Sequence, residues 1–328
     1  MKPVKWGVLG VSVHYRLRVS NAVRNSELTH IAAIASRKKD RAEKEARELG
    51  IPKAYGSYEE LLTDPEIEAV YIPLPNHIHA EWVKKAADHG KHVLCEKPFS
   101  MSAETTRETI EYVKNKGVLL MEAFMYKLHP QWVHARDLIR AGEIGKVQAV
   151  HTFFSYNLQD PANIRNKVET GGGAIPDIGC YAVSSARFLT GLEPKRVVSL
   201  IHRSPELKTD ILSSGVLDFS TIRGVFTVST QTFPYQRVQV FGTGGFLEID
   251  VPFNIYPDVS CKVEITNGVG TRTIMNKIAD MYKIEFDSFS RSVRTGDPLP
   301  ISTEDAVLNQ KVLDALYQSE KTGNWADV

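Results

Sequence analysis

In the first third of the chain, short runs of apolar residues alternate with segments whose apolar residues recur at helical spacing. Five runs predict buried strands: residues 4–9, 30–35, 69–72, 92–95 and 118–122. The segments between them predict helices over residues 20–25, 40–49, 57–62, 79–89 and 103–116. Because continuous apolar strands alternating with helices are typical of parallel sheets, we expect a doubly wound α/β domain with its ligand at the carboxyl ends of the strands.

The pattern changes after about residue 123. A helix is predicted over residues 129–141, and segments rich in β-branched and aromatic residues then dominate: 147–157, 196–202, 215–219, 224–232 and 237–249. Several alternate apolar with polar residues, which favours a mostly antiparallel sheet with one packed and one open face. Helices follow over residues 281–293 and 304–319. We therefore predict two domains, an α/β domain over residues 1–123 and an α+β domain over residues 124–328.

Composition narrows the classes of function. The 328 residues exceed one ordinary core, and 42% are hydrophobic while 24% are charged. A net charge of +1 provides no strong field for nucleic acid or an anionic membrane, and no apolar run reaches transmembrane length. The three cysteines (Cys95, Cys180 and Cys261) form no metal-binding or disulfide pattern. We expect a cytoplasmic protein with no bound metal.

The first strand leads into a turn that could hold a dinucleotide. Gly10, Ser12 and Tyr15 occupy the positions of a Gly-x-Gly-x-x-Gly fingerprint, and Gly10, Ser12 and Val13 are the residues expected to approach the pyrophosphate. Tyr15 is larger than the glycine that usually allows close packing of helix and strand. A plain strand-to-helix turn is the alternative.

The end of the second predicted strand bears on the choice of nucleotide. Domains that select NAD usually carry Asp or Glu there, whereas this chain has Ser36, Arg37 and Lys38. A hydroxyl and a guanidinium suit a 2′-phosphate, which favours NADP over NAD. The alternative is a solvated basic start to the next helix.

Two further turns follow buried strands at the same predicted edge. One contains Pro73, Leu74, Asn76 and His77, and the other contains Glu96 and Lys97 before Pro98. A lysine at this edge could bind a substrate hydroxyl and lower the pKa of a neighbouring acid. The alternative is that Lys97 begins a surface loop. We place all these residues except Pro98 among the cofactor contacts.

Later in the chain, three glycines precede a carboxylate and a phenol. Gly171, Gly172 and Gly173 are followed by Asp177 and Tyr181, whose spacing of four puts both on one helical face. Such a pair beside a glycine-lined approach suits proton transfer to a small polar molecule. A glycine-rich cap on an ordinary helix is the alternative reading.

Together these motifs resemble the Gfo/Idh/MocA family of NAD(P)-dependent oxidoreductases. The resemblance covers essentially the whole chain in the right order. The motifs that carry it are residues 96–98, 73–76, 122–126, 129–131, 163–165 and 171–181. The family implies a Rossmann domain followed by an open-faced sheet domain, which often pairs sheet to sheet, so we expect a homodimer or homotetramer.

The resemblance also assigns roles. It implies that Lys97 lies beside the nicotinamide and substrate, and that Tyr181 occupies the last catalytic position, as in the glucose–fructose oxidoreductase, D-xylose dehydrogenase, dimeric dihydrodiol dehydrogenase and sugar 3-ketoreductase branches. A free phenol has a pKa of ~10, which the charge of Lys97 should lower. Asp177 could hold Lys97 or a sugar hydroxyl.

Three more residues are candidates for substrate contact: Tyr126, His129 and Arg165. A surface ion pair for Arg165 and packed positions for Tyr126 and His129 are the alternatives. The leading hypothesis is an NADP-dependent oxidoreductase acting on a cyclic sugar or polyol. A trans-dihydrodiol dehydrogenase and a nucleotide-binding sensor without turnover are the rivals.

Overall fold

The computed structural model describes all 328 residues, which form two compact units. The first unit comprises residues Met1–Met125 and Met281–Val307, and the second comprises Tyr126–Asp280 and Leu308–Val328. No helix is long and apolar enough to cross a lipid bilayer.

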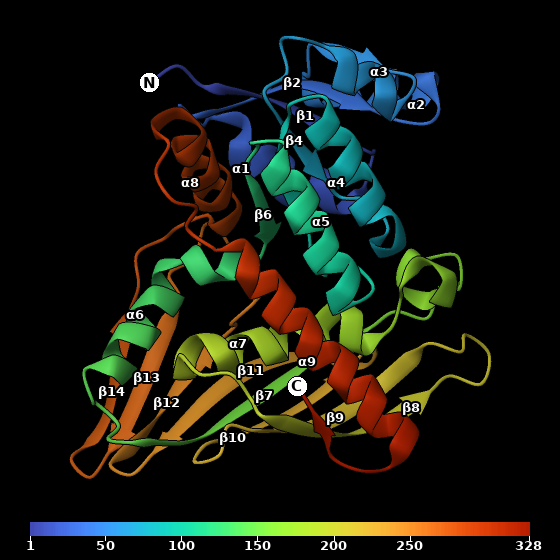
Figure 1. Cartoon of the computed structure of the whole chain (residues 1–328). Helices are drawn as coiled ribbons and strands as arrows, with labels where there is room; N and C mark the ends of the chain where they lie inside the picture. Colours follow the sequence, from blue (N-terminus) through green and yellow to red (C-terminus); the bar gives the residue numbers. More distant parts are fainter. The chain divides into compact units, whose positions relative to one another are not determined.

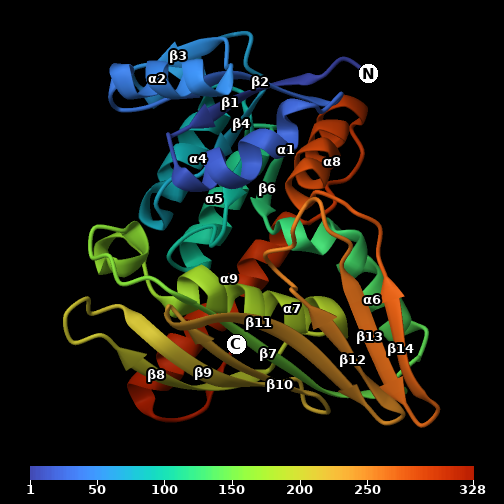
Figure 2. The same cartoon turned by 180° about the vertical axis from the view of Figure 1, so that it is seen from behind.

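The first unit contains a six-stranded sheet in the order β3-β2-β1-β4-β5-β6, and all of its pairings are parallel. The strands are β1 (Val4–Leu9), β2 (Thr29–Ala35), β3 (Lys53–Tyr55), β4 (Ala69–Ile72), β5 (His92–Glu96) and β6 (Leu120–Ala123). The helices are α1 (Ser20–Arg24), α2 (Lys39–Leu49), α3 (Tyr58–Thr63), α4 (His79–Asp88), α5 (Ala103–Asn115) and α8 (Met281–Thr295). Helices α4 and α5 cover one face, and α1 and α8 cover the other (Figures 1 and 2). The predicted doubly wound sheet is confirmed.

Helix α8 joins the first unit from the far end of the sequence. The ring of Trp6 on β1 lies 4.9 Å from that of Phe286 and 5.3 Å from that of Phe289, and its indole N–H donates to Ser290 Oγ at 3.0 Å. Trp6 and both phenylalanines are fully buried. The expected boundary at residue 123 left this helix with the second domain; in the structure its aromatic side chains complete the apolar core around β1.

An ion pair joins α8 to the residue before β4 and predicts that the stability of the first unit falls in acid. Both terminal nitrogens of Arg294 donate to the carboxylate of Glu68, at 2.6 and 2.7 Å, and these bonds lower the pKa of Glu68 to about 2. Since the folded-state pKa lies below the unfolded value, the pair stabilises the fold above about pH 4.5, and this stabilisation is lost as the pH falls toward 2. Glu68→Gln should lower the melting temperature at neutral pH and flatten its dependence between these limits. Calorimetry checks this, with exposed Glu43→Gln as control; identical profiles would contradict it.

The second unit is built on a nine-stranded sheet in the order β14-β13-β12-β11-β7-β10-β9-β8-β15. Its strands are β7 (Val147–Asn157), β8 (Arg196–Arg203), β9 (Asp210–Asp218), β10 (Arg223–Ser229), β11 (Gln231–Gly242), β12 (Gly245–Asp250), β13 (Lys262–Asn267), β14 (Gly270–Met275) and β15 (Ala326–Asp327). Only β7 and β10 pair in parallel. The predicted mostly antiparallel sheet is therefore confirmed.

The helices of the second unit lie on one face of this sheet. They are α6 (Pro130–Arg140), α7 (Cys180–Thr190) and residues 308–322 of α9 (Thr303–Thr322). The opposite face carries no helix of this unit (Figures 1 and 2). Side chains of β10 alternate accordingly: Phe226 is 2% exposed, while its neighbour Val225 is 36% exposed. The predicted open face is present.

Candidate active site

The turn after β1 has a backbone conformation at Gly10 that favours glycine. Gly10 has φ of +120°, and a Cβ there would lie 3.0 Å from Leu74 Cδ2, so a side chain would be both strained and crowded. The Gly10 N–H donates to the Ala35 carbonyl at 3.0 Å, which joins the turn to the end of β2. Ser12 Oγ accepts the Tyr15 N–H at 3.0 Å, while Val13 is exposed.

Tyr15 is accommodated by a change in the helix. Residues Tyr15–Val19 form a π-helical turn, in which the Ser20 N–H donates to the Tyr15 carbonyl. The Tyr15 side chain is 1% exposed, and its ring lies 6.2 Å from that of Tyr71. The large residue at the third fingerprint position is thus part of the core, and the helix after the turn begins with π-helical rather than α-helical hydrogen bonding.

The basic residues after β2 lie at the surface beside this turn. Ser36 is buried and its Oγ accepts the Lys38 N–H at 3.3 Å, whereas Arg37 and Lys38 are exposed. Burial raises the pKa of Tyr58, and the nearby guanidinium of Arg37 opposes that rise. Arg41 also reaches the turn, since its Nη2 donates to the Val11 carbonyl at 2.9 Å.

The two proline turns are joined by one imidazole. His79, which is fully buried, has Nε2 2.7 Å from the Leu74 carbonyl and Nδ1 3.0 Å from the Pro98 carbonyl. His79 carries none of the roles predicted from the sequence. In the structure it fixes the turn of residues 73–76 against the turn that carries Lys97. His77, two residues earlier, is exposed.

Glu96 lies in a buried cluster of polar groups at the end of β5. The Tyr71 hydroxyl donates to its Oε1 at 2.6 Å, and His14 Nε2 lies 3.4 Å from the same oxygen. Burial raises the pKa of Glu96, but His14, Lys97 and the Tyr71 hydroxyl together outweigh it and lower that pKa to about 2. Burial and the charge of Glu96 raise the pKa of Glu285, which is 1% exposed. The cluster therefore holds an anion next to Lys97.

In the second unit, the glycine motif forms a close-packed turn. Gly171 and Gly173 have φ of +79° and +134°, and a Cβ on Gly172 would collide with the backbone of Arg165. Residues Ile175–Gly179 then form a second π-helical turn that runs into α7. We expected one regular helical face for Asp177 and Tyr181; the segment instead changes from π to α between them.

Asp177 is held by two donors. Its Oδ2 accepts the Tyr156 hydroxyl at 2.5 Å and Arg165 Nε at 3.1 Å. Burial and the charge of Asp177 both raise the pKa of Tyr156, so the phenol keeps its proton and donates. Arg165 forms the ion pair that was the alternative to a substrate contact, and it forms it with a predicted catalytic residue.

Tyr181 lies among aromatic rings. Its ring is 5.1 Å from Phe253, 5.8 Å from Tyr126 and 5.9 Å from Phe154, and the residue is 5% exposed. These contacts restrict the phenol to few orientations. A phenol held in this way, four residues after a fixed carboxylate, is suited to moving a proton to or from a bound hydroxyl.

Tyr126 and His129 are packed in the core, which was the alternative to a substrate contact for both. The Tyr126 hydroxyl donates to Ser184 Oγ at 2.7 Å, and the side chain is fully buried. His129 is also fully buried and caps the N-terminus of α6: its Nδ1 accepts the Gln131 N–H at 3.2 Å, and its Nε2 lies 3.3 Å from the Ala279 carbonyl. Both side chains support the site from within the core.

Family comparison agrees with this geometry. Residues 4–124 match the model of the oxidoreductase family with an NAD-binding Rossmann fold, GFO_IDH_MocA, and residues 132–248 match the GFO/IDH/MocA C-terminal domain. The chain belongs to the Gfo/Idh/MocA family. It is accordingly an NAD(P)-dependent dehydrogenase or reductase with a nicotinamide dinucleotide as cofactor.

Relatives within the family come from several branches. The chain is 42% identical to D-xylose 1-dehydrogenase (NADP(+)) 2 of Haloferax volcanii, over 97% of this chain and 98% of the relative. It is 31% identical to mouse (Mus musculus) trans-1,2-dihydrobenzene-1,2-diol dehydrogenase, over 75% and 74%. Its fold matches the 3-ketoreductase KijD10 of Actinomadura kijaniata in complex with NADP and TDP-benzene, with a TM-score of 0.92, 26% identity and coverage of 97% and 98%.

The structure brings the predicted residues together in two groups. Those assigned to the cofactor, with Lys97, belong to the first unit; Arg165, Asp177 and Tyr181 belong to the second. No sequence motif pointed to Tyr156 or His79. The alternation of β7 could have pointed to Tyr156, since it places that residue on the same face as buried Phe154.

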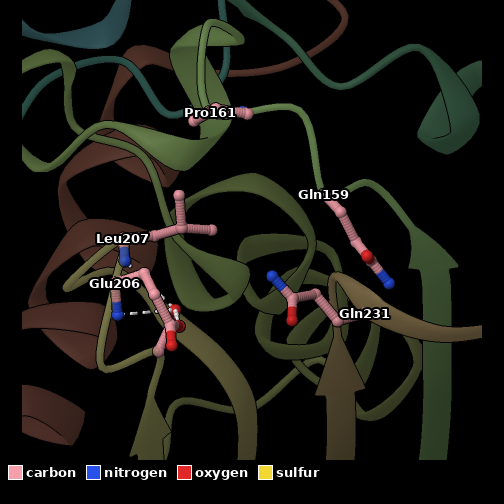
Figure 3. A pocket seen from close by; sticks show the side chains of 6 residues that line it. Gln159, Pro161, Glu206, Leu207 and Gln231 are labelled. Carbon is pink, nitrogen blue, oxygen red and sulfur yellow. Dashed lines mark hydrogen bonds between the residues drawn. The ribbon is translucent and has the colours of Figure 1, made fainter.

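A separate pocket of about 280 Å³ lies at one end of the nine-stranded sheet (Figure 3). Its lining residues are Gln159, Pro161, Ser204, Glu206, Leu207 and Gln231. None of them is a predicted catalytic or binding residue, and we assign this pocket no part in the reaction.

Proposed function

We propose that this protein is an NADP-preferring oxidoreductase that transfers hydride between nicotinamide and the carbon of a hydroxyl or carbonyl group in a cyclic sugar or polyol. The observation that carries the proposal is the Asp177 carboxylate, fixed by Tyr156 and Arg165 four residues before Tyr181. The relationship to a D-xylose 1-dehydrogenase supports the substrate class.

The residues of the first unit fit the cofactor. Gly10 gives the turn at the end of β1 a positive φ without a side chain of its own, and the exposed Arg37 and Lys38 follow buried Ser36 at the end of β2. We propose that Ser36, Arg37 and Lys38 bind the 2′-phosphate, since Arg pairs with phosphate through two parallel hydrogen bonds. The likeness to a reductase described with bound NADP supports this preference.

The side chains divide the chemistry between them. When bound, the nicotinamide accepts or donates the hydride. Tyr181 takes the hydroxyl proton of the substrate during oxidation and returns it during reduction. Lys97 lowers the pKa of this phenol and binds the substrate oxygen. Asp177, held by Tyr156 and Arg165, orients Lys97 or a further substrate hydroxyl.

A trans-diol is the second candidate substrate, because the chain is also related to a trans-dihydrodiol dehydrogenase. Steady-state reduction of NADP and NAD with a panel of aldoses, inositols and trans-diols tests both. Turnover of sugars or polyols supports the proposal, and turnover confined to trans-diols favours the alternative. Tight nucleotide binding without turnover on any compound would contradict both and indicate a sensor.

We further propose that the open face of the nine-stranded sheet pairs with the same face of a second copy. A shallow hollow on this face is lined by His151, Phe153, Val225, Thr227 and Tyr235, among others. Leu200, which is 79% exposed, belongs to the same sheet. Leu200 lies opposite Ser214, which lies opposite Thr227, so Leu200 extends the row of residues that lines the hollow. Exposed apolar side chains that gather on one face mark a surface that associates with another protein.

Val225→Asp tests this arrangement. The substitution adds one carboxylate per copy within the proposed interface, and burying these charges on association should weaken dimer formation by at least about 10-fold. Sedimentation over a range of concentrations measures the effect. Val269→Asp, at a position 99% exposed on the turn between β13 and β14, is the control and should leave association unchanged. A monomeric wild-type protein would contradict the proposal.

A further inference from the structure

A buried carboxylate on β9 is bonded to the turn of residues 173–180, which contains Asp177 and precedes Tyr181. Asp210, the first residue of β9, is 3% exposed. Its Oδ2 accepts the Ile175 N–H at 2.6 Å, and Ser213 Oγ lies 3.4 Å from the same oxygen. Ile175 begins the π-helical turn that contains Asp177. The proposed reaction uses Asp177 but assigns Asp210 no role.

The backbone of the turn is shaped around this carboxylate. Gly173 has φ of +134°, and a Cβ placed on it would collide with Asp210 Oδ1. The carboxylate therefore occupies the space that any other residue at position 173 would need. Glycine at this position is required by contact with Asp210 as well as by backbone conformation.

Helix α9 fixes Asp210 in turn. The Tyr317 hydroxyl donates to Asp210 Oδ1 at 3.1 Å, and burial and the charge of Asp210 raise the pKa of Tyr317, so this phenol stays protonated. Arg203 lies over the Tyr317 ring at 5.9 Å and forms an ion pair with Glu320. With the Tyr317 hydroxyl on Oδ1 and the Ile175 N–H on Oδ2, the Asp210 carboxylate has little freedom to move.

The same helix also reaches the far end of the turn. Asn309 Nδ2 donates to the Cys180 carbonyl at 3.2 Å, and both residues are buried. Cys180 immediately precedes Tyr181 and begins α7. Helix α9 thus engages the segment on both sides of Asp177, at Ile175 through Tyr317 and Asp210 and at Cys180 through Asn309.

We propose that Asp210 and Tyr317 are positioning residues that set the orientation of Asp177 and Tyr181 through the backbone of residues 173–180. The inference rests on the proposed function, because it concerns the same acid–base pair. Neither side chain needs to touch the substrate. A displacement of this turn by about 1 Å can cost up to about 100-fold in rate, whereas loss of one buried hydrogen bond costs only about 2–4 °C in melting temperature.

The experiment compares Tyr317→Phe with Ser319→Ala in the full-length protein. Each removes one hydroxyl from α9; Ser319 bonds to β8 and to the Asn324 carbonyl, away from the turn. Tyr317→Phe should lower kcat about 10-fold with little change in KM for the nucleotide, and it should speed amide exchange in residues 171–180 about 10-fold. Ser319→Ala should lower the melting temperature by about 2–4 °C, as Tyr317→Phe does, but should change neither kcat nor the amide exchange of residues 171–180.

Asp210→Asn and Asp210→Ala complete the test. Asn keeps an oxygen that can accept the Ile175 N–H, so it should retain more of kcat than Ala. Unchanged kcat and unchanged amide exchange in Tyr317→Phe would overturn the inference. Tyr181→Phe is measured in the same assay: if it keeps full turnover, the proposed mechanism fails, whereas loss of turnover in Tyr181→Phe alone rejects only the positioning role. Amide exchange in residues 171–180 tests whether Tyr317 and Asp210 hold this turn even when no substrate is known.

Discussion

Tyr181→Phe is expected to lower kcat by about 10²–10⁴-fold, the usual contribution of a positioned acid or base. The substitution removes only the hydroxyl. The ring keeps its contacts with Phe253, Tyr126 and Phe154, so the melting temperature should change little. Nucleotide affinity should also be retained, because the residues assigned to the dinucleotide belong to the first unit. Steady-state kinetics with a sugar from the panel, combined with nucleotide titration, measures both quantities.

Tyr112→Phe is a suitable control for this variant. The Tyr112 hydroxyl donates to Asp88 at 2.7 Å on the helical surface of the first unit, so its loss also removes one phenolic hydrogen bond. It should leave kcat within a few-fold of wild type. If Tyr181→Phe behaves like this control, Tyr181 is not the acid–base residue.

Arg37→Ala is expected to reduce the preference for NADP over NAD by about 10–100-fold. A charge-assisted hydrogen bond to a phosphate contributes about 1.5–3 kcal/mol to binding. NAD has no 2′-phosphate, so its binding does not include this bond and should not be weakened by the substitution. The effect should therefore appear in KM for NADP and leave kcat/KM for NAD nearly unchanged. Initial rates with both nucleotides at one saturating sugar concentration provide the ratio.

Lys44→Ala separates this contact from a general loss of positive charge. Lys44 is on α2, and its side chain is 72% exposed. Its removal should change the NADP:NAD ratio by less than about 2-fold, because exposed charges at a distance are screened by salt. An unchanged ratio in Arg37→Ala, or equal changes in both variants, would remove the case for a 2′-phosphate contact.

The parallel sheet could be predicted because each of its central strands is a continuous apolar run, and such runs are typical of strands buried on both faces. Strands β13 and β14 were not predicted, because neither contains such a continuous apolar run. Lys262–Asn267 and Gly270–Met275 contain mainly polar residues, and only a few side chains such as Val263 and Ile265 are buried. Pairing with β12 stabilises β13, and β14 pairs with β13 in turn; these contacts lie outside the local sequence.

The candidate site shows a similar limit. The spacing of Asp177 and Tyr181 and the family motifs pointed to both residues, but the partners of Asp177 come from distant segments. Tyr156 is one of several aromatic residues on β7, and only the fold brings its hydroxyl to Asp177. Asp210 and Tyr317 are 107 residues apart and no motif links them. The role of His129 as a helix cap likewise appears only in the structure, where its side chain accepts the Gln131 N–H.

The central claim is that hydride passes directly between a sugar carbon and the nicotinamide while Tyr181 handles the proton. The most direct test supplies NADP and aldoses or inositols deuterated at every carbon, and analyses the reduced nucleotide by mass spectrometry. The account predicts one deuterium per reduced nucleotide with wild-type protein and almost no product with Tyr181→Phe. Reduced nucleotide without deuterium, or nucleotide binding without reduction by any compound in the panel, would contradict it.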